Sequence, residues 1–217
     1  MKIDTVLLST AYFPPIEYFA AIANAGAVLL ERCETFQKQS YRTRCNIYGA
    51  NGLLSLIVPV KRDPTHKTGI ESVEIDYKTP WILQHKRAME AAYMTTPFFE
   101  YYMDDIYALL DRKESSLFSL NLSIIELFSN LAGITCNISL TEEYYKGERL
   151  KDMGITDLRE RIHPKYKGMS LLQELKIEKP YYQVFSDKQG FIPNLSMLDL
   201  LCNEGPNAIS YLKAYSD

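Results

Sequence analysis

Three cationic side chains lie close together in the N-terminal part of the chain: Lys38, Arg42 and Arg44. In an extended segment, residues 42 and 44 would point to the same side. Their planar guanidinium groups match the oxygens of a phosphate or a carboxylate, and Lys38 adds a point charge nearby. We therefore predict that these side chains bind an anionic small molecule. The alternative is that they form ion pairs with Glu31, Glu34 and the acidic residues of later helices.

His85 is the first candidate for acid/base catalysis, because histidine titrates near neutral pH. It shares the face of a predicted helix with Trp81 and two alanines, and a lone histidine in such a position is more often a buried core residue. A further histidine, His163, lies in a loop-rich stretch before Pro164. We predict a catalytic role for His85 and keep the core interpretation beside it.

Asp199 is the second catalytic candidate, as a base or as the partner of a cation such as Arg42. It recurs with Ser196 and Asn203 at i, i+3 and i+7 of a predicted helix. A polar stripe on an otherwise apolar helix must face water, a cap or a ligand. We predict that Ser196 and Asn203 contact the substrate, and an ordinary polar face is the alternative.

The aromatic and proline-rich turn that begins at Tyr12 and Phe13 follows a β-like run and precedes a predicted helix. Ligands of α/β sheets bind where strands end, and free N–H groups at a helix N-terminus attract anions. We therefore predict that Tyr12 and Phe13 contact the substrate; a rigid hydrophobic turn is the alternative. No histidine precedes His66, so the histidine pair usual in nucleotidyltransferases is missing here. Two further predicted contacts, which supply stacking and hydrogen-bonding groups, are Tyr93 and Gln183.

The elements that must position these residues follow an α/β order. A β-like run at 5–9, a helix at 16–25 and an apolar run at 27–31 have the βαβ rhythm of a parallel sheet. Residues 53–60 form a nearly continuous apolar run, which is typical of a strand buried on both faces. Residues 73–77 alternate as a half-exposed strand does.

Helices dominate the middle of the chain. Thr79-Pro80 and Thr96-Pro97 each have the pattern of a threonine N-cap before a proline at the first helical position. Residues 138–188 show no clean period and are expected to form long loops, and Asn194 is a candidate cap for a last helix. We expect an α/β fold with a largely parallel sheet covered by helices, an added helical layer from residues about 80–132, and one domain over 1–217.

Composition excludes several classes of protein. Hydrophobic residues make up 47% and charged residues 24% of the chain, as in a globular protein with a core. A net charge of −3 gives no general affinity for nucleic acid, and no apolar run is long enough for membrane insertion. Scattered cysteines and histidines predict no metal site and a cytoplasmic protein. The cofactor and the oligomeric state are left unspecified.

Ordered motifs run through nearly the whole chain: residues 9–19, residues 37–44, Val58-Pro59-Val60, Trp81 with His85, Tyr93 with Pro97-Phe98-Phe99, and residues 191–206. Together they resemble the WbqC-like family, as a short bacterial branch. The resemblance implies a family linked with surface-polysaccharide (O-antigen) biosynthesis and suggested to include amino-acid transferases.

Two segments depart from the family pattern. Ser9-Thr10-Ala11 stands in place of a glutamine that commonly precedes Pro-Tyr-Phe, and residues 157–165 stand where longer members carry a glycine-rich segment. Both departures fall where we expect a ligand loop.

The leading expectation is a transferase for a nucleotide-linked or amino sugar, or for its aminoacyl (glycine) acceptor, in surface polysaccharide biosynthesis. Two alternatives stay open. One is a non-catalytic protein that binds an anion or a partner, which full salt bridging of Arg42 and Arg44 would favour. The other is a nucleotidyltransferase-like enzyme or an ATP-dependent ligase.

Overall fold

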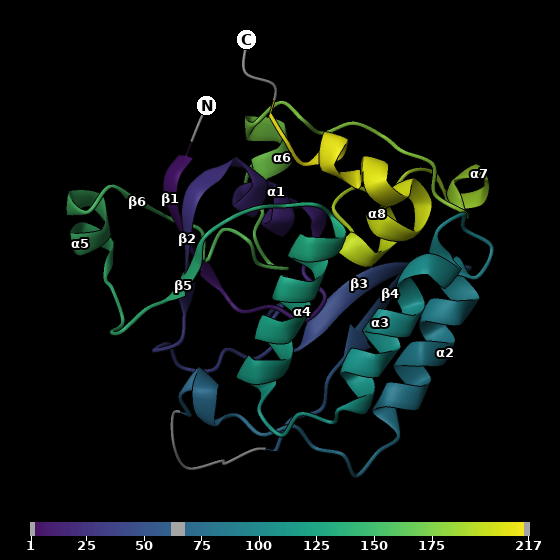
Figure 1. Cartoon of the computed structure of the whole chain (residues 1–217), viewed down its shortest axis with the longest axis horizontal. Helices are drawn as coiled ribbons and strands as arrows, with labels where there is room; N and C mark the ends of the chain where they lie inside the picture. The colour runs from purple at the N-terminus through teal and green to yellow at the C-terminus, as the bar shows by residue number, and fades with distance from the viewer. Residues whose placement is uncertain (1–2, 62–67, 215–217) are drawn as a thin grey trace.

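A four-stranded parallel sheet lies at one end of the computed structural model, which describes residues 3–61 and 68–214. The strand order is β5-β2-β1-β6, and each neighbouring pair is parallel. The strands, shown in Figure 1, are β1 (Ile3–Ser9), β2 (Ala25–Glu31), β5 (Ile138–Leu140) and β6 (Ile155–Asp157). The expected α/β fold with a parallel sheet covered by helices is therefore confirmed.

The predicted βαβ unit is formed by β1, helix α1 (Ile16–Asn24) and β2. Most side chains of β1 and α1 are buried. Helix α4 (Leu117–Leu131) packs against α1 and the first loop. Phe128 of α4 contacts Phe13 and Phe19, with ring centroids 5.4 and 6.0 Å apart. This aromatic contact joins the first loop to the helical layer.

The apolar run at 53–60 does not form the strand buried on both faces that its composition predicted. It begins with β4 (Gly52–Ile57), which pairs antiparallel with β3 (Arg44–Gly49) in a separate hairpin. Leu53 and Ile57 are 58% and 49% exposed, so this strand is not buried on both faces. The turn residues Ala50 and Asn51 precede Gly52, whose φ of 102° is accessible mainly to glycine. The Asn-Gly pair was the hairpin signal in the sequence.

The expected helical layer consists of α2 (Trp81–Tyr93), α3 (Phe99–Asp111) and α4. The predicted threonine caps are wrong: α2 and α3 start without a side-chain cap, and Thr96 instead donates a hydrogen bond to the Tyr93 carbonyl (2.6 Å). Ser116 does cap α4. Glu74 and Ile75 form isolated bridges rather than a strand, but the predicted alternation is present, because Val73 and Ile75 are buried and Glu74 is exposed.

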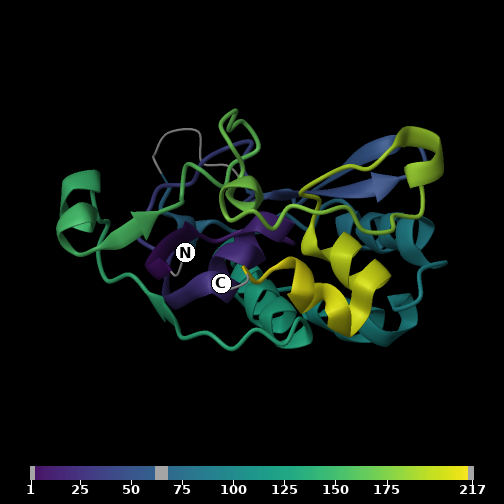
Figure 2. The same cartoon turned by 90° about the horizontal axis from the view of Figure 1, so that it is seen from above.

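Residues 138–188 contain more structure than we predicted. They supply β5 and β6, and the short helices α5 (Gly147–Asp152), α6 (Leu171–Glu174) and, just beyond, α7 (Ser186–Gln189). These strands of only three residues lack a readable alternation, and their partners β1 and β2 define them. In Figures 1 and 2, α5 lies at the sheet end of the molecule and α7 at the hairpin end.

The C-terminal part closes the fold with α8 (Met197–Glu204) and a 3₁₀ segment, η2 (Gly205–Tyr211). Asn194 does not cap α8. Its Oδ1 accepts a hydrogen bond from the Glu17 amide of α1 (2.9 Å), and Ser196 caps α8. One more short 3₁₀ segment, η1 (Ile70–Ser72), packs beside α4.

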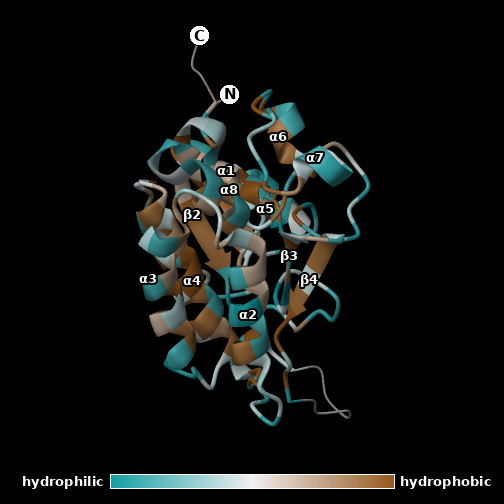
Figure 3. Ribbon diagram, turned by 90° about the vertical axis from the view of Figure 1, so that its right-hand side faces the viewer, coloured by the Kyte–Doolittle hydropathy of each residue, from teal (hydrophilic) through white to brown (hydrophobic). Residues whose placement is uncertain are grey.

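Hydropathy follows this arrangement. In Figure 3 the hairpin strands are largely hydrophobic, whereas the helices alternate between the two kinds of residue. Within the described residues, no helix combines the length and apolarity needed to cross a membrane.

Candidate functional site

Polar side chains gather where the strands of the parallel sheet end. Ser9 is the last residue of β1, Glu31 the last of β2 and Asp157 the last of β6, while Thr141 directly follows β5. Because parallel strands end at the same edge, these four residues come together although they lie far apart in the sequence. This edge is the usual ligand-binding edge of α/β sheets.

Arg42 is buried at this edge, 2% exposed, and is bound by a carboxylate. Its Nε donates to Glu34 Oε1 (2.7 Å), and its Nη2 donates to Glu34 Oε2 (2.5 Å) and to Ser9 Oγ (2.7 Å). The Ser9 hydroxyl in turn donates to Glu34 Oε2 (2.9 Å). The ion-pair alternative is thus confirmed for Arg42 with Glu34. The predicted extended segment is wrong, because Arg42 lies in a turn before β3.

Arg159, which follows β6, is the second buried arginine of this edge. It donates to Glu31 Oε2 (2.8 Å), to both carboxylate oxygens of Asp157 (2.9 and 2.7 Å) and to the Tyr145 carbonyl (2.9 Å). Burial alone would lower the pKa of Arg159, but hydrogen bonding to Asp157 and the nearby negative charges raise it above its ordinary value. Glu31 is fully buried and also accepts a hydrogen bond from Thr141 (2.7 Å). The network ties β2, β5 and β6 together.

A narrow pocket, which we call the strand-end pocket, lies between these two arginines and has room for about one water-sized group. It is lined by Leu8, Ser9, Thr10, Ala11, Tyr18, Tyr41, Arg42, Leu158, Arg159 and Ile162. Both segments that depart from the family pattern, 9–11 and 157–165, contribute to this lining. The two segments therefore meet at one pocket, and a ligand loop there stays a prediction.

Thr10 supplies the most informative atom of the strand-end pocket. The residue is 1% exposed, and its Oγ1 has no hydrogen-bond partner among the described residues. A buried hydroxyl without a partner costs about 1–3 kcal/mol relative to a paired one. Such an atom beside a pocket is the expected feature of a site whose partner is a ligand or a water molecule.

Cations also lie outside the pocket mouth. Arg44 is half-buried and Lys38 and Lys165 are exposed; no ion pair engages these three side chains within the described residues. Burial lowers the pKa of His163, and the positive charges of Arg42, Lys165 and Arg44 lower it further against the opposing charge of Glu160. Arg44 lies two residues from Arg42, and His163 and Lys165 follow Ile162 in the chain; Arg42 and Ile162 both line the pocket, and we call Arg44, His163 and Lys165 the rim. Two further basic residues of the N-terminal part of the chain, Arg62 and Lys67, lie outside the described residues.

The N-terminus of α1 is occupied by the chain itself. Its first amides, those of Ile16 and Glu17, donate to the Leu195 carbonyl (2.9 Å) and to Asn194 Oδ1 (2.9 Å). The predicted anion site of free N–H groups is thus wrong for these two amides. Tyr12 and Phe13 are 0% and 1% exposed and pack against protein, as in the rigid-turn alternative. Their assignment as ligand contacts stays a prediction.

His85 lies in the interior, 5% exposed. Its Nδ1 is 2.8 Å from the Tyr12 hydroxyl, and its ring lies against Trp81 with centroids 5.1 Å apart. Burial lowers the pKa of His85 to about 4, although a hydrogen bond with the Ile57 backbone opposes this effect. The imidazole is therefore neutral at pH 7 and surrounded by aromatic rings, as in the core alternative.

Asp199 forms a third, separate group. Its Oδ2 accepts from the Tyr181 hydroxyl (2.5 Å) and from the Gln183 amide (3.1 Å), and a hydrogen bond from Tyr93 also reaches its carboxylate. Burial raises the pKa of Asp199 to about 6 despite these three hydrogen bonds. Asp199 therefore accepts hydrogen bonds from neutral donors. The suggested pairing of Asp199 with Arg42 is not present.

The two neighbours of Asp199 on α8 make contacts within the fold. Ser196 donates to the Phe13 carbonyl (2.9 Å), and the Asn203 amide donates to the Asp199 carbonyl (2.7 Å). The Oδ1 of Asn203 is buried without a partner among the described residues.

The predicted site residues thus separate into three places. The first is the strand-end pocket with Arg42, Arg44 on the rim, and Lys38 exposed on the turn before Arg42. The second is the aromatic interior with His85 and Tyr12. The third is the surroundings of Asp199 and its helix, which hold Gln183, Tyr93, Ser196 and Asn203. Among the residues that the structure describes, no ion pair and no hydrogen bond between two side chains joins one place to another, although the Ser196 hydroxyl donates to the carbonyl of Phe13, beside Tyr12. No group of three or more histidine, cysteine or carboxylate side chains there has the geometry to hold a metal ion.

The sequence reasoning missed Thr10, Thr141, Asp157 and Arg159 as site residues, and it treated Glu31 and Glu34 only as ion-pair partners. Their common signal is position at or just after the end of a strand. That signal was readable for Ser9 and Glu31, because β1 and β2 were predicted. It was not readable near β5 and β6, which are three residues long.

Comparison with known proteins gives two matches. A family model described as the WbqC-like protein family matches residues 10–211. The uncharacterized protein Rv1507c of Mycobacterium tuberculosis (strain ATCC 25618 / H37Rv) is 27% identical over 223 residues, which cover 95% of this chain and 96% of the relative. No solved structure matches the chain at a significant level.

Proposed function

Because the chain belongs to the WbqC-like protein family, we propose that it is a transferase whose ligand binds in the strand-end pocket. The proposed ligand is a nucleotide-linked or amino sugar, or its aminoacyl acceptor, used in the cytoplasm for bacterial surface polysaccharide of the O-antigen type. This substrate class rests on the family resemblance, whereas the place of binding rests on the geometry.

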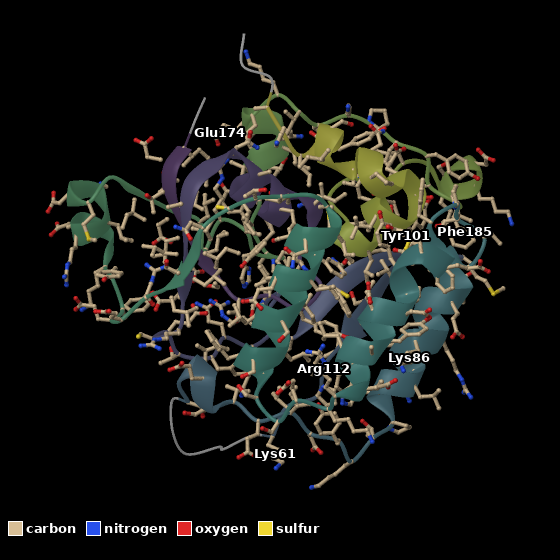
Figure 4. The ribbon with its side chains drawn as sticks, viewed as in Figure 1. Lys61, Lys86, Tyr101, Arg112, Glu174 and Phe185 are labelled. Atoms are coloured by element: carbon tan, nitrogen blue, oxygen red, sulfur yellow. The ribbon has the colours of Figure 1, made fainter. Side chains whose placement is uncertain are left out.

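The observation that supports the place is Thr10 Oγ1. It is a buried, unpartnered hydroxyl that lines a pocket at the carboxyl ends of parallel strands, between Arg42 and Arg159. Two buried ion pairs hold those arginines in place, so the pocket wall is preorganised. Other lysine and arginine side chains of the molecule lie away from this site. Lys61, Lys86 and Arg112, which Figure 4 labels, lie away from the parallel sheet.

The chemistry that the surrounding residues would supply is positioning and proton transfer. Arg44 and Lys165 on the rim, with Lys38 nearby, would attract the anionic part of the donor. His163 is the histidine of the rim, and its lowered pKa keeps the imidazole neutral at pH 7. Its Nδ1 accepts a hydrogen bond from the Lys165 amide (3.1 Å), so Nε2 carries the hydrogen and would donate a hydrogen bond to the ligand. His85 and Asp199 remain the sequence-based acid/base candidates, and a role for either requires the ligand to reach the interior.

The experiment is a thermal-shift screen of nucleotides, sugar nucleotides and aminoacyl compounds on the wild type and on Thr10→Val. A ligand that binds the folded protein raises the melting midpoint by mass action. We expect a sugar nucleotide to raise it for the wild type and to raise it less for Thr10→Val. Ser129→Ala is a matched control, because Ser129 is another buried hydroxyl without a partner but lies in α4 outside the pocket lining.

Three outcomes contradict or redirect the proposal. No shift with any compound removes the small-molecule proposal. An equal loss of the shift in Thr10→Val and Ser129→Ala places the ligand elsewhere. A shift that requires Mg²⁺ and ATP favours a nucleotidyltransferase or ligase instead.

The pairing of Arg42 with Glu34 supports a second candidate, a non-catalytic protein that binds the same ligand. Turnover separates the two: incubation with the sugar nucleotide found in the screen releases nucleotide only if the protein transfers or hydrolyses the sugar. Liquid chromatography of the nucleotide products measures this release.

A further inference from the structure

The two arginines of the strand-end pocket have few donors left for a ligand. Arg42 uses Nε and Nη2 on Glu34 and Ser9, and its Nη1 donates to Gln37 Oε1 (3.3 Å). Arg159 uses Nε and Nη2 on Asp157 and Tyr145, and its Nη1 donates to Glu31. A guanidinium has five N–H donors, so each arginine retains one on Nη1. Neither presents the pair of parallel donors that binds a phosphate or carboxylate in bidentate fashion.

The formal charges around the pocket also disfavour an anionic ligand. Glu31, Glu34 and Asp157 carry −3, and Arg42 and Arg159 carry +2, so the five groups sum to −1. A phosphate placed among them would be a further negative charge in a site where four of the five side chains are nearly inaccessible to water. No surplus of positive charge would offset the free-energy cost of removing the phosphate from water.

The hydroxyl groups of the pocket are better suited to a neutral ligand. Thr10 Oγ1 can both donate and accept, and Ser9 Oγ keeps one acceptor site beyond its contacts with Arg42 and Glu34. Single N–H donors together with a free hydroxyl match the separated hydroxyls of a sugar or polyol. The pocket has room for about one water-sized group, so a single hydroxyl of the ligand enters and the rest of the ligand stays outside.

The rim has the opposite character. Arg44 Nε is buried without a hydrogen-bond partner within the described part of the chain, and Lys165 is exposed beside it near His163. No carboxylate of the residues that the structure describes neutralises these cations in an ion pair, in contrast to Arg42 and Arg159.

We infer that the strand-end pocket binds a neutral, hydroxyl-bearing group of sugar or polyol type, and that the anionic part of the same ligand binds outside it, at Arg44. This inference rests on the proposed function and assigns different chemistry to two arginines that are separated by one residue. Arg42 is a positioning residue for the pocket wall, and Arg44 is the anion contact.

The test uses ¹H–¹⁵N spectra of the full chain with three probes: a neutral hexose such as glucose, inorganic phosphate, and the corresponding hexose 1-phosphate. We expect the hexose to move the amide signals of residues 9–11, phosphate to move those near Arg44, and the hexose phosphate to move both sets. Loss of one buried hydrogen bond weakens binding by about tenfold. Thr10→Val should therefore weaken binding of the hexose and of the hexose phosphate by about tenfold, and leave phosphate binding unchanged.

Arg44→Gln provides the reciprocal result. It should weaken the binding of phosphate and hexose phosphate and leave hexose binding unchanged, and Ser129→Ala should change none of the three. Thr10→Ser retains the hydroxyl and should bind as the wild type does, which separates loss of the hydrogen bond from loss of shape. The dispersed spectrum of each variant confirms that it is folded.

Three results would overturn the inference, and they differ in what they imply for the proposed function. If phosphate moves the amide signals of residues 9–11 and this binding depends on Thr10, the pocket binds an anion. The inference then fails and the proposed site stands. Absence of shifts at residues 9–11 with every probe shows that only water satisfies Thr10, and both proposals then fail. Hexose binding that is unaffected by Thr10→Val also overturns the inference.

Discussion

Two regions of this molecule bury ionisable side chains, and they stabilise them differently. At the ends of the parallel strands, Glu31 and Glu34 remain in ion pairs with Arg159 and Arg42. Around α8, Asp199 has only neutral hydrogen-bond donors, and burial raises its pKa to about 6. The first region keeps charge in the interior by pairing it, whereas the second reduces charge by favouring the protonated form.

The difference bears on function. A paired arginine holds its geometry over a wide pH range and forms a rigid wall, as a preorganised binding pocket requires. A carboxyl group that titrates near pH 6 within a closed shell of tyrosines changes the stability of its surroundings with pH. We therefore expect variants of the two regions to respond to pH in different ways.

The largest effect is expected when one partner of the buried ion pair is removed. Arg42→Met leaves the Glu34 carboxylate buried without a cation, which costs about 3–5 kcal/mol of unfolding free energy. The double variant Arg42→Met with Glu34→Leu should recover most of this loss, since no uncompensated charge remains. Urea unfolding at pH 7 measures both; a double variant as unstable as the single one would show that packing, not charge, dominates the region.

The next largest effect concerns Asp199. Its folded pKa of about 6 exceeds the ordinary value of 3.8, so its contribution to stability is full below the ordinary value and is lost as the pH rises through the folded value. One pKa unit corresponds to about 1.4 kcal/mol, so the loss amounts to at most about 3 kcal/mol. Asp199→Asn lacks this titration. The stability of the variant relative to that of the wild type should therefore be higher at pH 8 than at pH 4.5. Equal slopes of stability against pH for both proteins would contradict the assignment.

His85 should act with the opposite sign in an overlapping pH window. Its folded pKa of about 4 lies below the ordinary value of 6.5, so its contribution is present above the ordinary value and is lost as the pH falls through the folded value. Because one pKa unit is about 1.4 kcal/mol, this loss is at most about 3.5 kcal/mol, and less where acid lets water in. His85→Gln, compared with the wild type by thermal unfolding from pH 7 to pH 4, should show a smaller decline. A steeper decline would mean that His85 is protonated in the folded protein.

The smallest effect on stability is expected at Thr10. Thr10→Val removes a buried hydroxyl that has no partner and keeps the shape of the side chain, so the unfolding free energy should stay within about 1 kcal/mol of the wild type or rise. Chemical unfolding without ligand measures this value. A loss as large as that of Arg42→Met would show that the hydroxyl supports the fold rather than a ligand.

Part of the architecture was predictable. The β1-α1-β2 unit, the helices between residues 81 and 131 and the last helix follow from apolar periodicity, because each is long enough to display its period. The hairpin was missed because its apolar run was taken for a buried strand, although Asn51-Gly52 marked the turn. The strands β5 and β6 were missed because three residues carry no pattern.

The candidate site was predictable only in part. Arg42 and Arg44 were chosen for their charge, and both lie at or beside the pocket, but the sequence could not show that one is neutralised and the other is not. That distinction depends on Glu34, which folds back from the segment after β2. The unpartnered state of Thr10 likewise depends on every group that surrounds it in space.

The sequence by itself determined the family, the βαβ start and the chemistry available in each segment, because residue type and local period are properties of the chain. Only the tertiary structure decided which charges meet. The ends of β1, β2, β5 and β6 lie up to 148 residues apart, from Ser9 to Asp157, and parallel pairing alone brings them to one edge. Pairing of charges and access of water are set by such long-range contacts, and these decide which buried groups are available to a ligand.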